Sequence, residues 1–201
     1  ASDVYKRQPH KVNLGVGVYF DENGKLPLLT CVRSAEEQLM AKPSARGYLP
    51  IDGIAAYDAA VKALVFGAES TALSEQRVAT VQALGGTGGL KIGADFLKKI
   101  NPSAKVLISD PSWENHRALF TQAGFSVGTY TYYDANQRGV NFQGMLDSLR
   151  QAEAGTVVVL HACCHNPTGY DISLSQWQQV IEVVKSKNLV PFLDMAYQGF
   201  G

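Results

Sequence analysis

The chain has 201 residues, of which 46% are hydrophobic, and its 18 Lys plus Arg balance 18 Asp plus Glu. The length suits one domain, or one and a part, with a buried core, and the zero net charge argues against a nucleic-acid or membrane-surface partner. We find no secretory leader, no apolar run near the roughly 18 residues of a membrane span, and no even framework among Cys31, Cys163 and Cys164, so we expect a cytoplasmic protein.

The first 26 residues lack the regular pattern of the rest and include an apolar segment over 12–19 and a turn at 21–24. From residue 53 onward, helix-like and strand-like segments alternate. Apolar residues at helical spacing predict helices over 54–66, 90–100, 113–123, 142–151 and 174–184. Apolar or β-prone runs predict strands over 77–84, 105–109, 125–133, 156–161 and 189–193.

This alternation predicts βαβ units and therefore an α/β fold with a mainly parallel sheet sandwiched by helices. Ser173 and Gln176 offer a capping box at the start of the last helix, and Gly67 and Gly124 can each end an earlier one.

Ligands of open parallel sheets bind at the carboxyl ends of the strands, so the residues after each strand are the candidate site. The 77–84 segment runs into GGTGG at 85–89, at a helix start. Glycines let a ligand approach the backbone, free N–H groups favour an anion, and Thr87 adds a hydroxyl donor. The motif indicates a phosphate site or merely a tight turn, and it matches neither the P-loop nor the G-x-G-x-x-G spacing.

The 105–109 strand is followed by DPSWENH, which contains Trp113 and His116. An indole at this edge can stack on a planar ligand or serve as an aromatic anchor of the core. His116 can contact the same site or cap local backbone groups.

The 156–161 strand is followed by a run that holds His161, Cys163, Cys164 and His165. Two histidines and two cysteines so close together suggest zinc. However, adjacent cysteines on a strand point to opposite faces, and the chain has no second ligand cluster, so we expect no metal. A Cys–His nucleophile lacks an identifiable orienting group.

Asp194 ends the last strand after five largely apolar residues. A carboxylate there needs a donor or a positive partner, such as a protonated heterocyclic nitrogen, unless it is an ordinary cap. Together with the phosphate cradle, the indole and the amide of Asn166, it describes a pocket for a planar phosphorylated heterocycle.

Six motifs in register give the sequence a resemblance to a known family. They are NLGVGVY at 13–19, GYLPIDG at 47–53, GGTG at 85–88, DPSWENH at 110–116, CCHNPTG at 163–169 and DMAYQGF at 194–200. Over about residues 9–201 the chain closely resembles the class I aspartate and aromatic amino-acid aminotransferases. These enzymes use pyridoxal 5′-phosphate (PLP) on fold type I.

The resemblance implies a role for each matching residue at the cofactor ring. Asp194 would pair with the protonated pyridine nitrogen, and Asn166 and Tyr197 would hydrogen-bond the phenolic O3′. His116 would support Asp194 from behind, and His161 would lie in the same outer layer. The Asn166–Pro167 bond would be cis.

The resemblance also implies contacts around the ring, the phosphate and the substrate. Trp113 would stack on the ring, while Gly86 and Thr87 would bind the phosphate. Tyr48 would reach the phosphate of the neighbouring subunit in a homodimer. The substrate would be flanked by Val16, Gly17, Trp113 and Asn166.

The family's Schiff-base lysine lies in a Ser-x-x-Lys segment beyond the Tyr-Gln-Gly-Phe motif, and no lysine of this chain has that context. We therefore expect no catalytic residue here and interpret the chain as an N-terminal fragment, inactive alone. Residues 1–26 would belong to the small domain or dimer arm, and 27–201 to the incomplete PLP-binding large domain. The full enzyme would exchange an amino group between an L-amino acid, aspartate or aromatic, and a 2-oxo acid. The alternatives are a fold-type-I PLP lyase and a non-catalytic phosphate- or nucleotide-binding module.

Overall fold

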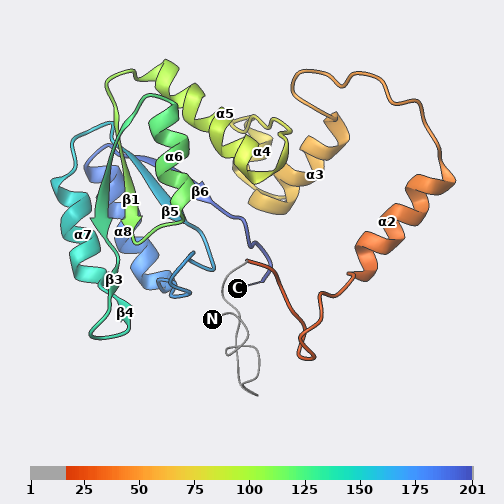
Figure 1. Ribbon diagram of the computed structural model, residues 1–201. Coiled ribbons are helices and arrows are strands. Elements are labelled where there is room, and N and C mark those ends of the chain that lie inside the picture. The colour runs from red at the N-terminus through yellow and green to blue at the C-terminus, as the bar shows by residue number, and fades with distance from the viewer. Residues whose placement is uncertain (1–16, 201) are drawn as a thin grey trace. The chain divides into compact units, whose positions relative to one another are not determined.

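The computed structural model describes residues 17–200, which divide into two compact units at Tyr48 and Leu49 (Figure 1). In the first unit, the expected turn forms around Asp21, whose carboxylate accepts the backbone N–H groups of Asn23 and Lys25. Helix α2 (Thr30–Ala41) follows, and none of its described residues is buried. Over residues 17–48, the described part of the first unit, no residue is buried and no core forms.

The second unit is built on a parallel sheet, as the alternation of elements predicts. In the described chain its four strands lie in the order β2-β1-β5-β6, and every neighbouring pair is parallel. They are β1 (Lys105–Asp110), β2 (Ser126–Thr131), β5 (Val157–His161) and β6 (Val190–Asp194). A small antiparallel pair, β3 (Tyr133–Asp134) and β4 (Gly139–Val140), leads into the next helix.

Helices cover both faces of this sheet (Figure 1). The helices of the second unit are α3 (Ala55–Phe66), α4 (Thr71–Ser74), α5 (Gly85–Ile100), α6 (Glu114–Gln122), α7 (Phe142–Gln151) and α8 (Leu174–Ser186). One core cluster joins α7 and α8 to side chains such as Val158 and Leu160 of β5. The other joins α5 and α6 to the alternate side chains Val157 and Val159.

Several helix ends follow from local sequence. Ser173 and Gln176 form the predicted capping box: the Ser173 hydroxyl accepts the Gln176 N–H, and the Gln176 side chain accepts the Ser173 N–H at 2.8 Å. Gly67 ends α3 and Gly124 follows α6, both with positive φ that glycine adopts without a steric cost.

The direction of α5 is fixed by contacts along its length. Its Lys98 ammonium lies 4.8 Å from the centre of the Phe125 ring, just before β2 begins. Nearer its start, a Cβ on Gly93 would lie 2.9 Å from the Phe192 ring of β6. The helix therefore runs antiparallel to the strands, and its N-terminus points toward the edge where the strands end.

The predicted strand over 77–84 is wrong for the described chain. The segment has no regular secondary structure and pairs with no strand among residues 17–200, and Leu84 is 95% exposed. Its Gln82 instead donates its N–H to Asp52 at 2.8 Å and accepts the Ile54 N–H on its side chain. The local pattern favours an extended backbone, but a strand needs a neighbouring strand to receive its hydrogen bonds.

The helix expected over 90–100 begins earlier, at Gly85, so the GGTGG run forms the first turn of α5. Glycine disfavours helix intrinsically, but packing of the apolar face of α5 against the sheet overrides that preference. In residues 17–200 we find no helix with the length and apolar character needed to cross a membrane.

Candidate active site

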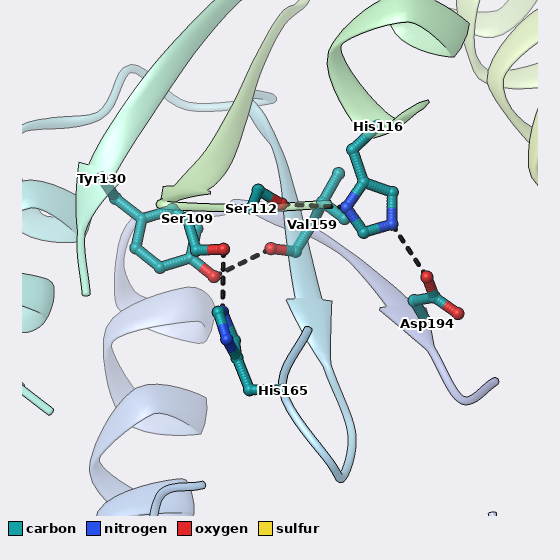
Figure 2. A network of polar contacts seen from close by, with 7 residues as sticks. All are labelled: Ser109, Ser112, His116, Tyr130, Val159, His165 and Asp194. Atoms are coloured by element: carbon teal, nitrogen blue, oxygen red, sulfur yellow. Dashed lines mark hydrogen bonds and ion pairs between the residues drawn. The ribbon is translucent and has the colours of Figure 1, made fainter. Parts of the chain in front are cut away.

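The carboxylate of Asp194, the last residue of β6, is held by a buried histidine. His116 Nε2 lies 2.8 Å from Asp194 Oδ2, and the His116 side chain is fully buried in the first turn of α6 (Figure 2). This hydrogen bond holds the pKa of Asp194 below its usual range, although burial acts in the opposite direction. The site therefore presents an ionised carboxylate.

The far side of the His116 ring is also held. Ser112 Oγ lies 2.9 Å from His116 Nδ1, so Nε2–H can donate to the carboxylate while the hydroxyl donates to Nδ1 (Figure 2). The Trp113 ring meets the His116 ring edge-on, with centroids 5.4 Å apart. Trp113 thus lies beside the Asp194 support, at the N-terminus of α6, and is half-buried.

His161 ends β5 directly beside Asp194 in the strand register. Its ring packs between His116 and His165, with centroid distances of 5.0 and 4.2 Å. Both ring nitrogens are buried, and neither has a hydrogen-bond partner among the described residues. Burial and the nearby His116 lower the pKa of His161 to about 4, so the ring is neutral at pH 7.

His165 lies at the inner end of this row of rings. Its Nε2 lies 2.9 Å from Ser109 Oγ and its Nδ1 lies 2.8 Å from Thr168 Oγ1, so both ring nitrogens are satisfied. The Tyr132 ring stacks on it at 3.9 Å. Burial, with a contribution from His161, lowers the pKa of His165 to about 3.

Asn166 follows His165 in the loop after β5. The Asp171 carboxylate holds this loop by accepting the backbone N–H groups of Cys164 and His165, at 2.7 and 2.8 Å. Asn166 is half-buried, and the Asn166–Pro167 peptide is cis, as the resemblance implied. The Asp110–Pro111 peptide is also cis.

The N-terminus of α5 forms a different kind of feature at the same edge. The residue at its N-cap is Leu84, so no N-cap side chain accepts the first N–H groups of the helix, and its first turn contains no acidic residue. Gly86 and Thr87 are exposed, and a Cβ on Gly86 would meet nothing within 4 Å. The first N–H groups of a helix lack intrahelical partners, so this turn can accept an anion.

The structure thus brings Trp113, His116, His161 and Asp194 together at the carboxyl edge of the sheet. Tyr197 lies in the turn after β6 and is half-buried. Tyr48 and Gly17 belong to the other unit and are exposed, and Val16 lies outside the described residues. The roles of these residues toward a cofactor remain predictions.

Sequence reasoning missed the inner layer of the site. Ser109 and Tyr132 complete the surroundings of His165, and Ser112 those of His116. Ser112 lies within the DPSWENH motif, and its position four residues before His116 is a signal that could have identified it. Nothing in the sequence marks Tyr132 as the partner of a ring 33 positions away.

The described residues contain a single group of three potential metal ligands, His116, His161 and Asp194, whose ligand atoms lie within 4.8 Å of one another. Two of the three already bond each other, and neither cysteine of the zinc hypothesis joins the group. The expectation of no metal is left as a prediction.

Comparisons with known proteins identify the family of the chain. The sequence model of the family described as "Aminotransferase class I and II" matches residues 9–201. The chain therefore belongs to the class I and II aminotransferase family. Its fold is similar to the crystal structure of an aromatic-amino-acid aminotransferase from Burkholderia pseudomallei covalently bound to pyridoxal phosphate, with a TM-score of 0.92 and 63% identity. The match covers 100% of this chain and 51% of that protein.

Individual relatives point to two substrate classes. The chain is 60% identical to an aspartate aminotransferase of Pseudomonas aeruginosa, covering 96% of this chain and 49% of that protein. It is 50% identical to an aromatic-amino-acid aminotransferase of Escherichia coli, and the match covers 98% of this chain and 50% of that protein. The chain spans about half the length of these curated relatives. A phosphate-binding module outside this family is not favoured.

Proposed function

We propose that the chain is part of a PLP-dependent aminotransferase that moves an amino group between an L-amino acid, aspartate or aromatic, and a 2-oxo acid. The observation that carries this proposal is the ionised Asp194, fixed by a buried His116 at the edge toward which the N-terminus of α5 points. Membership of the aminotransferase family supports it.

The residues present fit this cofactor. A fixed carboxylate matches a protonated pyridine nitrogen, and an open helix N-terminus matches a phosphate. When bound, PLP supplies an electron sink for chemistry at the carbon that bears the amino group. Asp194 would hold the proton at the pyridine nitrogen. The neighbouring His161 is neutral at pH 7 and so adds no positive charge that would weaken this pairing.

The other contacts form the rest of the proposal. Trp113 would stack on the ring, Asn166 and Tyr197 would hydrogen-bond O3′, and Gly86 with Thr87 would hold the phosphate. The exposure of Gly86 and Thr87 and the half-burial of Trp113, Asn166 and Tyr197 are compatible with these roles.

The first unit would complete the site in a homodimer. We propose that Tyr48 reaches the phosphate of a neighbouring subunit and that Val16 and Gly17 flank the substrate. Residues 1–26 would form part of the small domain or dimer arm, and 27–201 part of the large domain. The lysine that bonds the cofactor would lie beyond Gly201, so the 201-residue chain alone would not transaminate. The unpaired cysteines of the described chain support a cytoplasmic location.

The decisive experiment uses the protein extended through the downstream Ser-x-x-Lys motif. Borohydride reduction should fix PLP to that lysine, and amino transfer to a 2-oxo acid should be detectable with aspartate or an aromatic amino acid. The 201-residue chain is the matched control and should show no transfer. Transamination by the 201-residue chain, or tight AMP binding with no trapped PLP in the extended protein, would contradict the proposal.

A further inference from the structure

The two adjacent cysteines lie in a bend and not on a strand. Strand β5 ends at His161, and Cys163 and Cys164 occupy the bend that follows. Cys164 has a φ of 49°, in the left-handed region that turns the chain sharply. The premise that these side chains alternate across a sheet is therefore wrong.

The two thiols instead belong to consecutive residues of one bend. Both residues are half-buried and free of disulfides, and the Cys164 thiol is among the groups that raise the pKa of Cys163. The backbone at this point is anchored, because Asp171 accepts the Cys164 and His165 N–H groups at 2.7 and 2.8 Å. The fold thus holds a pair of neighbouring thiols in place, with partial access from solvent.

The chemical state of the pair argues against ordinary disulfide chemistry. Burial, followed by the neighbouring Cys164, raises the pKa of the Cys163 thiol, and the carboxylates of Asp171 and Asp194 act in the same direction. A protonated thiol attacks disulfides slowly. A direct bond between the sulfurs is also strained, because adjacent Cα atoms lie about 3.8 Å apart and disulfides usually need about 4.4–6.8 Å.

A divalent metal is disfavoured by the number of ligands. Structural zinc takes four protein ligands and catalytic zinc three. Among residues 17–200 the three-ligand group contains neither cysteine. A ligand of this pair must therefore bind through only two sulfurs and prefer soft donors. The atom that binds the sulfurs must already carry its third substituent.

We propose that Cys163 and Cys164 form a binding site for trivalent organic arsenicals. Two As–S bonds form and the As=O bond of an aryl arsenoxide is lost. The oxygen leaves as water with the two thiol protons, so arsenic stays trivalent and no oxidant is needed. The inserted arsenic atom lengthens the link between the sulfurs by one atom, which relieves the constraint that opposes a direct disulfide.

The site lies next to the proposed cofactor pocket but is independent of it. Asn166 follows Cys164 by two residues, so an occupied site would constrain the loop that carries it. Binding of the arsenical can nevertheless be measured by mass alone, without PLP or activity. Failure of this inference is therefore distinguishable from failure of the proposed function.

The test is intact-mass measurement of the full 201-residue chain after incubation with phenylarsine oxide. We expect one adduct for each chain, which resists an excess of a monothiol but is removed by a dithiol. Cys163→Ser and Cys164→Ser should each lose the resistant adduct. Cys31→Ser is the matched control and should retain it, because Cys31 is an exposed single cysteine.

Peptide mapping covers the case in which a variant fails to fold. Trypsin places both thiols in the peptide 151–185 and Cys31 in the peptide 26–33. The adduct of the unaltered chain should map to 151–185 and block alkylation of both thiols there. An adduct on 26–33, removal by the monothiol, or full retention in a folded Cys163→Ser protein would overturn the inference.

Discussion

The two ends of the candidate cofactor site are built in different ways. At the Asp194 end, side chains hold one another, because His116 bonds both Asp194 and Ser112 (Figure 2). The His161 ring packs against His116. At the α5 end, the candidate donors are the free backbone N–H groups of the first turn, and Gly86 and Thr87 are exposed. Substitutions should therefore have large effects at the first end and small ones at the second.

The largest effect should follow from Asp194→Asn, which removes the negative charge but keeps the shape. Without a carboxylate to hold a proton at the pyridine nitrogen, we expect kcat of the extended protein to fall at least about 100-fold, in the range seen when a preorganised electrostatic group is lost. Steady-state kinetics, with PLP titration as a second readout, provide the measurement.

The control for that change is Asp147→Asn, because Asp147 forms an exposed pair with Arg150 on α7. Exposed pairs contribute about 0–1 kcal/mol, so activity should stay within a factor of two or so of the unaltered protein. Equal activity of the Asp194→Asn and Asp147→Asn proteins would show that the Asp194 carboxylate is not needed for catalysis.

The next effect concerns the contact that positions α5 against β6. In Gly93→Ala the new Cβ would lie 2.9 and 3.1 Å from two atoms of the Phe192 ring, so the helix or the ring must move. We expect the free energy of unfolding to fall by about 1–3 kcal/mol, as for other overpacked sites. Urea denaturation measures it.

Gly89→Ala is the matched control on the same helix. Its Cβ would lie 3.7 Å from Ala83, an ordinary contact, and alanine favours helix over glycine. Its stability should be unchanged or higher. If both alanines were tolerated equally, the inferred packing of α5 on β6 would be incorrect.

The third prediction uses the row of histidines behind Asp194. The folded-state pKa values of His161 and His165, about 4 and about 3, lie below the ordinary value of 6.5, so the unfolded chain binds more protons in between. Stability should therefore fall as pH drops from about 6.5 toward 4, by at most about 1.4 kcal/mol per pH unit for each histidine. Thermal or urea unfolding at several pH values measures the slope.

His161→Phe separates this effect from the general loss of stability in acid. It removes one titrating group and two unpartnered nitrogens, so the slope between pH 6.5 and 4 should become shallower. The lowered pKa of Asp194 changes stability at a more acidic pH than the histidines do, because its stabilisation is lost only as the carboxylate is protonated. An unchanged slope in His161→Phe would show that His161 is protonated in the folded state.

The sequence predicted those parts of the molecule that depend on near neighbours. The Ser173–Gln176 capping box, the parallel strand alternation and the position of Asp194 at a strand end all follow from residues close together in the chain. The 77–84 strand failed because strand formation needs a partner that the local pattern cannot supply. The stacking of Tyr132 and the bend that holds the two cysteines were missed for a related reason, since both arise only in the folded chain.

The smallest effect should come from Thr87 at the α5 end. Thr87→Val removes one hydroxyl donor but leaves the backbone N–H groups and the helix dipole in place, so PLP affinity should fall only about three- to tenfold, equivalent to one hydrogen bond. Thr87→Ser keeps the donor and should bind PLP as the unaltered protein does. Equilibrium titration of the extended protein measures both. A loss in Thr87→Val as large as that in Asp194→Asn would mean that side chains, and not the helix N-terminus, hold the phosphate.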